Sequence, residues 1–223
     1  MKNLLFAALP LILAGGAAAT ALTVKLREHE HTAIIAPRIE TPAAPAGRIA
    51  VTPEQLREAY AAGLIDRPIK TILDVRSPMT YGDFRWDDKG VAAGPVWVRV
   101  DLDSQIVSVF RSGQEIGTAV ILYGADGVPT PTGKFPVLAK LKDHRSITYD
   151  NAPMPYTLRL TRDGVSIHGS NVRWGFATHG CVGVPAQFAA KLFDAVETGD
   201  EVLIVSKNAL SGNRSPAASA AAL

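Results

Sequence analysis

Apolar and polar residues alternate through the central and C-terminal parts of the chain. In 96–102, valines at every second position alternate with Trp97, Arg99 and Asp101. A two-residue period is typical of strands, and short turn sequences such as the one at 103–104 indicate hairpins between them. The pattern predicts six strands in this part of the chain, at 96–102, 105–111, 115–123, 156–161, 165–168 and 201–205.

Two segments instead show the period of a helix. The first, 52–65, has Thr52 as its N-cap, Pro53 in the first turn and Gln55 completing a capping box. The second, 186–196, has four large apolar residues on one face, so we expect it to pack on a sheet. They are Phe188, Leu192, Phe193 and Val196. Short strands with one or two packed helices predict a mainly β domain, arranged as a sandwich or a barrel.

Changes in composition divide the chain into five regions. We expect a signal peptide or membrane anchor at 1–21, a proline- and alanine-rich linker at 22–50, an N-terminal extension at 51–94, the main domain at 95–206, and a disordered tail at 207–223. The extension is expected to begin with the helix at 52–65 and to contain one strand, at 70–75.

The N-terminus has the features of an export signal. Lys2 precedes the apolar segment 4–13, and small residues follow at Ala17, Ala19 and Ala21, where a signal peptidase would cut. The uncharged stretch 4–24 is also long enough to span a bilayer, so an uncleaved inner-membrane anchor is the alternative. Both interpretations place the rest of the chain in the periplasm or cell envelope.

Composition narrows the classes of protein to consider. The 223 residues are 47% hydrophobic and 20% charged, as in a globular chain with one main core. The formal charge of +2 gives no indication of a nucleic-acid partner.

The chain contains one cysteine, Cys181, which has no partner for an internal disulfide. A free thiol is often a small buried hydrophobe, but the neighbouring His179, Gly180 and Gly183 are typical of an exposed turn. His168 ends a predicted strand thirteen positions earlier, so one loop would bring a base to the thiol. These parts favour a cysteine acyltransferase.

A zinc site is the alternative use of the same residues. His168, His179 and Cys181 would supply three ligands, but structural zinc sites are normally closed by four. We therefore expect no metal cofactor.

Two sequence motifs connect the proposed cysteine chemistry with a known protein family. The sequences "IHGS" at 167–170 and "THGCVGVP" at 178–185 resemble the signature of the L,D-transpeptidase catalytic domain, also called YkuD-type. The resemblance extends over 95–205 and includes "PTPTGKF" and "MPYTLRL". It implies an L,D-transpeptidase-type β-sandwich, with 95–206 as the catalytic domain.

The resemblance also implies roles for individual residues. Cys181 would be the nucleophile and His168 its base, oriented by the backbone carbonyl of Gly169. Backbone N–H groups of the segment from His179 to Cys181, including Gly180, would bind the oxyanion. Met154, Tyr156 and Thr178 would contact the substrate.

The implied reaction is acyl transfer between peptidoglycan stem peptides through a cysteine acyl-enzyme, with no organic cofactor. Its physiological setting would be peptidoglycan biosynthesis, cell-wall biogenesis and cell shape. A lipoprotein amine is a second candidate acceptor, and water would make the enzyme a carboxypeptidase or a hydrolase that releases wall-linked proteins. A non-catalytic wall-binding module is the third class. It comes into question because the family usually has Arg or Asn where this chain has Gly183.

Overall fold

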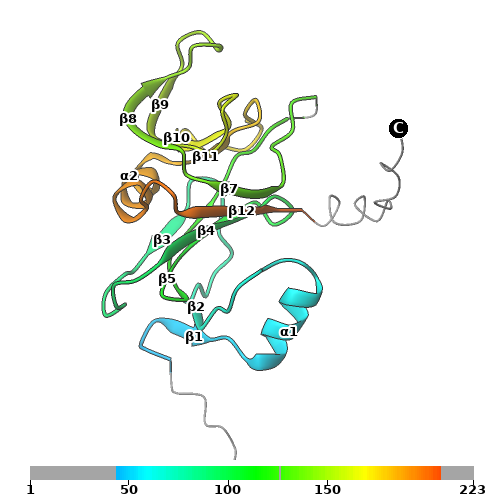
Figure 1. Ribbon diagram of the computed structural model, residues 1–223, viewed down its shortest axis with the longest axis vertical. Helices are drawn as coiled ribbons and strands as arrows, with labels where there is room; N and C mark the ends of the chain where they lie inside the picture. The colour runs from blue at the N-terminus through cyan, green and yellow to red at the C-terminus, as the bar shows by residue number, and fades with distance from the viewer. Residues whose placement is uncertain (1–43, 126, 207–223) are drawn as a thin grey trace, which may run out of the picture. The chain divides into compact units, whose positions relative to one another are not determined.

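Strands dominate residues 44–125 and 127–206, the part of the chain that the computed structural model describes (Figure 1). These described residues form twelve strands and two helices. In chain order the elements are β1 (Arg48–Ala50), α1 (Pro53–Ala61), β2 (Thr71–Leu73), β3 (Phe84–Trp86), β4 (Val96–Asp101), β5 (Ile106–Arg111), β6 (Gln114–Val120), β7 (Gly133–Pro136), β8 (Ala139–Arg145), β9 (Pro153–Arg159), β10 (Ser166–Ser170), β11 (Val182–Pro185), α2 (Ala186–Ala195) and β12 (Glu201–Val205).

The larger of the two sheets is built around the predicted meander β4–β5–β6. Its strand order is β1-β2-β6-β5-β4-β12-β7, and β3 also pairs with β6. The last strand, β12, returns parallel to β4, with Val202 opposite Val98. Alternation of buried valines and isoleucines along these strands gives the sheet one wholly apolar face.

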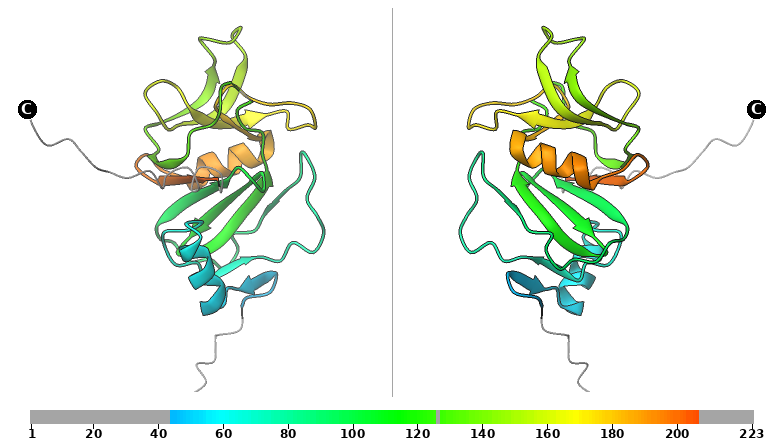
Figure 2. Two further views of the ribbon diagram at one scale, coloured as in Figure 1. Left: turned by 90° about the vertical axis from the view of Figure 1, so that its right-hand side faces the viewer. Right: turned by 90° about the vertical axis from the view of Figure 1, so that its left-hand side faces the viewer.

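The smaller sheet has the order β11-β10-β9-β8. The chain leaving β6 connects the two sheets, since Leu122 pairs with Gly183 and Gly124 pairs with Thr178. Helix α2 packs against β9, β10, β11 and β6, and Figure 2 shows it between the sheets. Its buried face, with Phe188 and Leu192, joins both sheets in one core.

The N-terminal extension is part of the larger sheet. Trp97 and Phe110, which stack at 4.5 Å between ring centroids on the other face of that sheet, are covered by Ile65 and Ile69 of the extension. The buried Glu115 accepts a 2.7 Å hydrogen bond from the backbone N–H of Leu73 in β2. The extension therefore completes both the hydrogen bonding and the packing of this sheet.

The prediction of a mainly β domain with one or two packed helices is confirmed. Helix α1 has the predicted capping box, in which Thr52 and Gln55 bond each other's backbone N–H groups. Strands β3, β7, β8 and β11 were not predicted, so the extension contains β3 in addition to its one predicted strand. Residues 48–50, within the predicted linker, also form a strand, because they pair antiparallel with β2. The buried guanidinium of Arg48 donates to the backbone carbonyls of Glu115 and Asp87.

The predicted signal or anchor at 1–21, most of the linker and the tail at 207–223 lie outside the described residues. Within the described residues, the helices are too short and too polar to cross a membrane.

Candidate active site

Pairing on both sides fixes the segment that carries Cys181. On one side β11, which starts directly after Cys181, pairs in parallel with β10 and sets Gly183 opposite His168. On the other side Gly183 exchanges two backbone hydrogen bonds with Leu122, of 2.8 and 2.9 Å. The imidazole thus comes from β10, and the thiol from the residue directly before the neighbouring strand β11.

The buried imidazole of His168 has a defined orientation. Its Nδ1 lies 3.0 Å from the carbonyl oxygen of Gly169. A carbonyl only accepts hydrogen bonds, so Nδ1 carries the proton and Nε2 has the lone pair. Burial lowers the pKa of His168, the Gly169 carbonyl acts in the opposite direction, and nearby His144 lowers it further. The group is therefore a neutral base around pH 7.

The thiol of Cys181 is in its neutral form. Burial raises its pKa, although a backbone hydrogen bond from Ser166 acts in the opposite direction. The Sγ atom donates to the carbonyl of Gly164 at 3.8 Å, and no hydrogen bond among the described residues joins it to His168. Attack on a substrate therefore requires rotation of the thiol toward the imidazole and transfer of its proton.

Two threonines hold the backbone of the cysteine turn. The hydroxyls of Thr178 and Thr130 donate to the carbonyl of Cys181 at 2.5 and 3.3 Å. The Thr130 hydroxyl also accepts from the N–H of Gly124 at 2.9 Å. Gly180, at φ +95°, adopts the left-handed conformation that closes the turn. Thr178 was predicted to bind substrate, but its hydroxyl bonds the turn itself. Thr130, which lies in "PTPTG", was not predicted as a site residue.

An aromatic contact covers the outer side of the turn. The imidazole of His179 stacks on the ring of Tyr149 at 4.2 Å between centroids and 18° between planes. Tyr149 comes from the connection between β8 and β9, a segment with no sequence motif that indicates a site residue.

Met154 and Tyr156, the two residues predicted to contact the substrate from β9, do not line the nearby hollow, whereas the prolines next to them do. Met154 is buried, and the ring of Tyr156 packs edge-on against Phe193 of α2 at 5.9 Å. A hollow of about 600 Å³ beside them is lined by Pro153 and Pro155, together with Gly169, Ser170 and the first turn of α2. The strand thus borders the hollow through its prolines.

The described residues contain no group of three or more His, Cys, Asp or Glu side chains placed to hold a metal ion.

Gly183 lies at a close approach between three segments. A Cβ atom added there would lie 2.9 Å from Cβ of Ser170 and 3.4 Å from Cβ of Leu122. The absence of a side chain is therefore required by the packing of this chain, in which Ser170 occupies the available space.

Replacing Gly183 with Asn, one of the family's usual residues, is expected to destabilise the protein by about 1–3 kcal/mol, because Ser170 must move. Thermal unfolding measures the change. Adding Ser170→Gly in the same chain should recover part of the loss, since it removes the closest contact. Equal melting temperatures for wild type and Gly183→Asn would contradict the packing explanation.

Comparison with known proteins places part of the chain in a family. Residues 95–204 match the model of the L,D-transpeptidase catalytic domain family, YkuD. This region of the chain belongs to the L,D-transpeptidase family.

Individual relatives are distant. L,D-transpeptidase 1 from Mycobacterium tuberculosis is 27% identical over 139 residues, and the match covers 52% of this chain and 53% of that protein. The chain therefore matches only about half the length of this curated relative. A solved L,D-transpeptidase from Stackebrandtia nassauensis is 25% identical with a TM-score of 0.47, covering 51% of this chain and 57% of that chain. One from Enterococcus faecium is 26% identical with a TM-score of 0.46, covering 51% and 50%.

Proposed function

We propose that the protein is a peptidoglycan L,D-transpeptidase in which Cys181 is the nucleophile and His168 the general base. The observation that carries the proposal is the 3.0 Å contact between Nδ1 of His168 and the carbonyl of Gly169. It leaves Nε2 as a proton acceptor beside the strand that begins after Cys181. A backbone carbonyl here takes the orienting role that a carboxylate has in a catalytic triad.

The proposed reaction has two acyl-transfer steps. Nε2 of His168 takes the thiol proton as Sγ attacks the carbonyl carbon of the donor stem peptide at its third residue. Backbone N–H groups of the turn from His179 to Cys181 stabilise the oxyanion. The C–N bond then breaks, the terminal D-alanine leaves with the proton from His168, and a thioester remains. The amine of a second stem attacks the thioester, gives up a proton through His168 and releases Cys181.

Positioning of the turn is part of this proposal. The hydroxyls of Thr178 and Thr130 hold the Cys181 carbonyl, so the adjacent N–H groups have fixed directions before substrate arrives. Such preorganisation is the main requirement of an oxyanion site.

The acidic limb of the pH profile is predicted to have its midpoint below pH 6.5. Acylation needs neutral His168, whose pKa is lowered from the ordinary 6.5, mainly by burial. Activity should therefore persist at pH 6.5 and fall at lower pH, as the imidazole becomes protonated. Measuring kcat/KM for acylation against pH tests this.

His144→Gln provides the matched variant for the pH profile. It removes the smaller electrostatic contribution that lowers the His168 pKa, so the midpoint should move upward. A wild-type midpoint above 6.5 would contradict the neutral-base assignment.

The reaction itself is tested with muropeptides that carry tetrapeptide stems. Purified protein should produce crosslinked dimers, detected by mass spectrometry. Tripeptide stems without dimers would instead identify a hydrolase, and binding without turnover would identify a wall-binding module. Adding a lysine-bearing lipoprotein peptide to the same assay tests the second acceptor. Because the stem peptides lie outside the cytoplasmic membrane, the proposal includes export, with 1–21 as the signal or anchor.

A further inference from the structure

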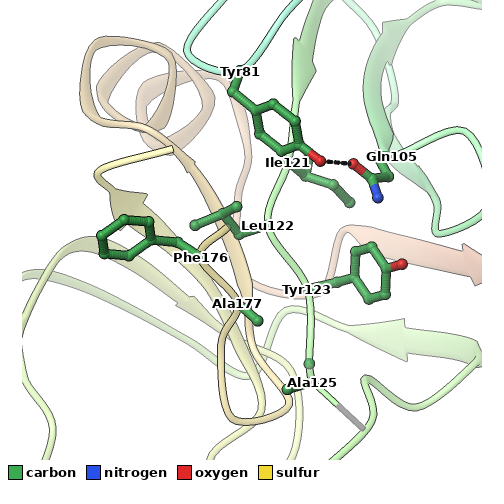
Figure 3. Close-up of a pocket in the computed structure, with 9 residues that line it drawn as sticks. Tyr81, Gln105, Ile121, Leu122, Tyr123, Ala125, Phe176 and Ala177 are labelled. Atoms are coloured by element: carbon green, nitrogen blue, oxygen red, sulfur yellow. Dashed lines mark hydrogen bonds between the residues drawn. The ribbon is translucent and has the colours of Figure 1, made fainter. Parts of the chain in front are cut away.

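A second hollow is bordered by residues 121–125, the segment that pairs with the cysteine turn. Its volume is about 300 Å³, and it is bordered by Tyr81, Gln105, Leu122, Tyr123 and Phe176 (Figure 3). These residues come from distant parts of the sequence. Tyr81 belongs to the N-terminal extension, Gln105 to the turn between β4 and β5, and Phe176 to the loop between β10 and the cysteine turn.

The hollow combines aromatic rings with polar groups held in place. The hydroxyl of Tyr81 donates to Oε1 of Gln105 at 2.6 Å, and Nε2 of Gln105 points away from Tyr81 (Figure 3). The backbone carbonyl of Gln105 accepts from the N–H of Ile121 at 3.0 Å. Gln105 is thus fixed at both its backbone and its side chain, so little entropy is lost when a ligand binds there.

The rim presents unusually exposed aromatic side chains. Phe176 is 60% exposed, and Trp174 is 81% exposed while packing edge-on against Tyr81 at 5.7 Å. Large exposed aromatic residues grouped at a hollow mark interaction sites rather than ordinary surface.

The lining residues that the structure describes are all uncharged. A stem peptide carries carboxylate and ammonium groups, and bringing such groups to a site without a partner charge is unfavourable. A lipid chain would offer no hydrogen-bond acceptor to Nε2 of Gln105, the amide atom that is not bonded to Tyr81. A sugar ring fits both conditions, because it offers an apolar C–H face to aromatic rings and hydroxyl or acetamido groups to an amide.

The hollow is bordered by residues that pair with the segment carrying Cys181. Leu122 and Gly124, which line it, pair with Gly183 and Thr178 of the segment that carries Cys181. A glycan strand held here would therefore present its attached stem peptides close to the thiol.

We propose that this hollow binds a neutral N-acetylated sugar ring of the peptidoglycan glycan strand, with Phe176 and Tyr81 stacking on the ring and Gln105 bonding its polar groups. The inference rests on the proposed function for its choice of substrate. It assigns to the N-terminal extension, through Tyr81, a part in recognising the glycan.

Binding is tested without any turnover. The full chain is titrated with the tetrasaccharide of β-1,4-linked N-acetylglucosamine by calorimetry. Saturable binding is expected, and Phe176→Ala should weaken it about two- to tenfold, because one stacking partner is lost. Tyr60→Ala, which removes another exposed aromatic ring, on α1, is the control and should bind like wild type. Absence of saturable binding, or equal affinity in Phe176→Ala, would overturn the inference.

Kinetics then separates the inference from the proposed function. The ratio of kcat/KM for a disaccharide-tetrapeptide to kcat/KM for the free tetrapeptide should fall in Phe176→Ala and stay constant in Tyr60→Ala. An unchanged ratio in Phe176→Ala would overturn glycan recognition while leaving the transpeptidase proposal intact. Failure of wild type to convert either substrate would overturn the proposed function, and the titration would then decide the inference alone.

Discussion

Cys181→Ala is expected to lower turnover of tetrapeptide stems by at least about a thousandfold, because the acyl-enzyme can no longer form. Cys181 is the one cysteine of the sequence, so no second thiol can replace it. The fold should persist, since the bonds that hold the turn go to the backbone carbonyl of Cys181 and not to its side chain.

An acylating probe reports the nucleophile directly. A carbapenem has a strained β-lactam carbonyl that acylates an activated thiol, so wild type should gain one adduct in intact-protein mass spectrometry. Cys181→Ala should gain none, and an adduct on that variant would disprove the assignment. His168→Ala retains the thiol but should react and turn over far more slowly than His144→Ala, since only His168 is proposed to take the thiol proton. Equal effects of the two histidine variants would argue against His168 as the base.

Gly124→Ala is expected to have the largest effect among substitutions outside the nucleophile and base. An added Cβ would lie 2.2 Å from the carbonyl oxygen of Val128 and 2.7 Å from the backbone nitrogen of Thr130. These are backbone atoms, so the whole 128–130 loop must move, and Thr130 then loses its contact with the Cys181 carbonyl. We expect a loss of about 1–3 kcal/mol in stability together with a large loss of turnover.

Gly127→Ala is the matched control in the same loop. Nothing lies within 4 Å of its added Cβ, but its φ of +94° makes alanine unfavourable by about 1–2 kcal/mol. Both variants should therefore show lower melting temperatures, while Gly127→Ala should retain turnover. Equal turnover in the two variants would show that the loop does not support the cysteine turn.

Local patterns predicted the elements whose residues have one buried and one exposed face. The capping box of α1, the meander β4–β5–β6 and the apolar face of α2 are all visible as spacing in the sequence. Strand β8, "AKLKDHR", was missed because its exposed side chains lack apolar alternation, and it is held by pairing with β9 instead. His144 lies in this strand. Strand β11, "VGVP", has the composition of a turn, because glycine and proline disfavour strands in isolation, and it is held by pairing with β10.

The residues of the candidate site could also be predicted only in part. His168 and Cys181 could be proposed from residue chemistry and motif resemblance, and the contact of His168 with the Gly169 carbonyl was expected from the resemblance. The contacts of Thr130 and Tyr149 with the cysteine turn could not be predicted, because they form only when distant segments meet in the folded chain. Sequence spacing also gave no indication that the thiol would face Gly164 or that Ser170 fills the space beside Gly183.

Strands β2 and β3 have a practical consequence for expression of this protein. Both pair with β6, on the side away from β5, and both precede residue 95. A chain shortened to the matched region, 95–204, would leave β6 as an unprotected edge and would uncover Trp97 and Phe110. Unpaired edge strands and exposed apolar patches bind other molecules of the same fragment, so such a fragment should aggregate. The unit that folds on its own is therefore larger than the unit that the family shares.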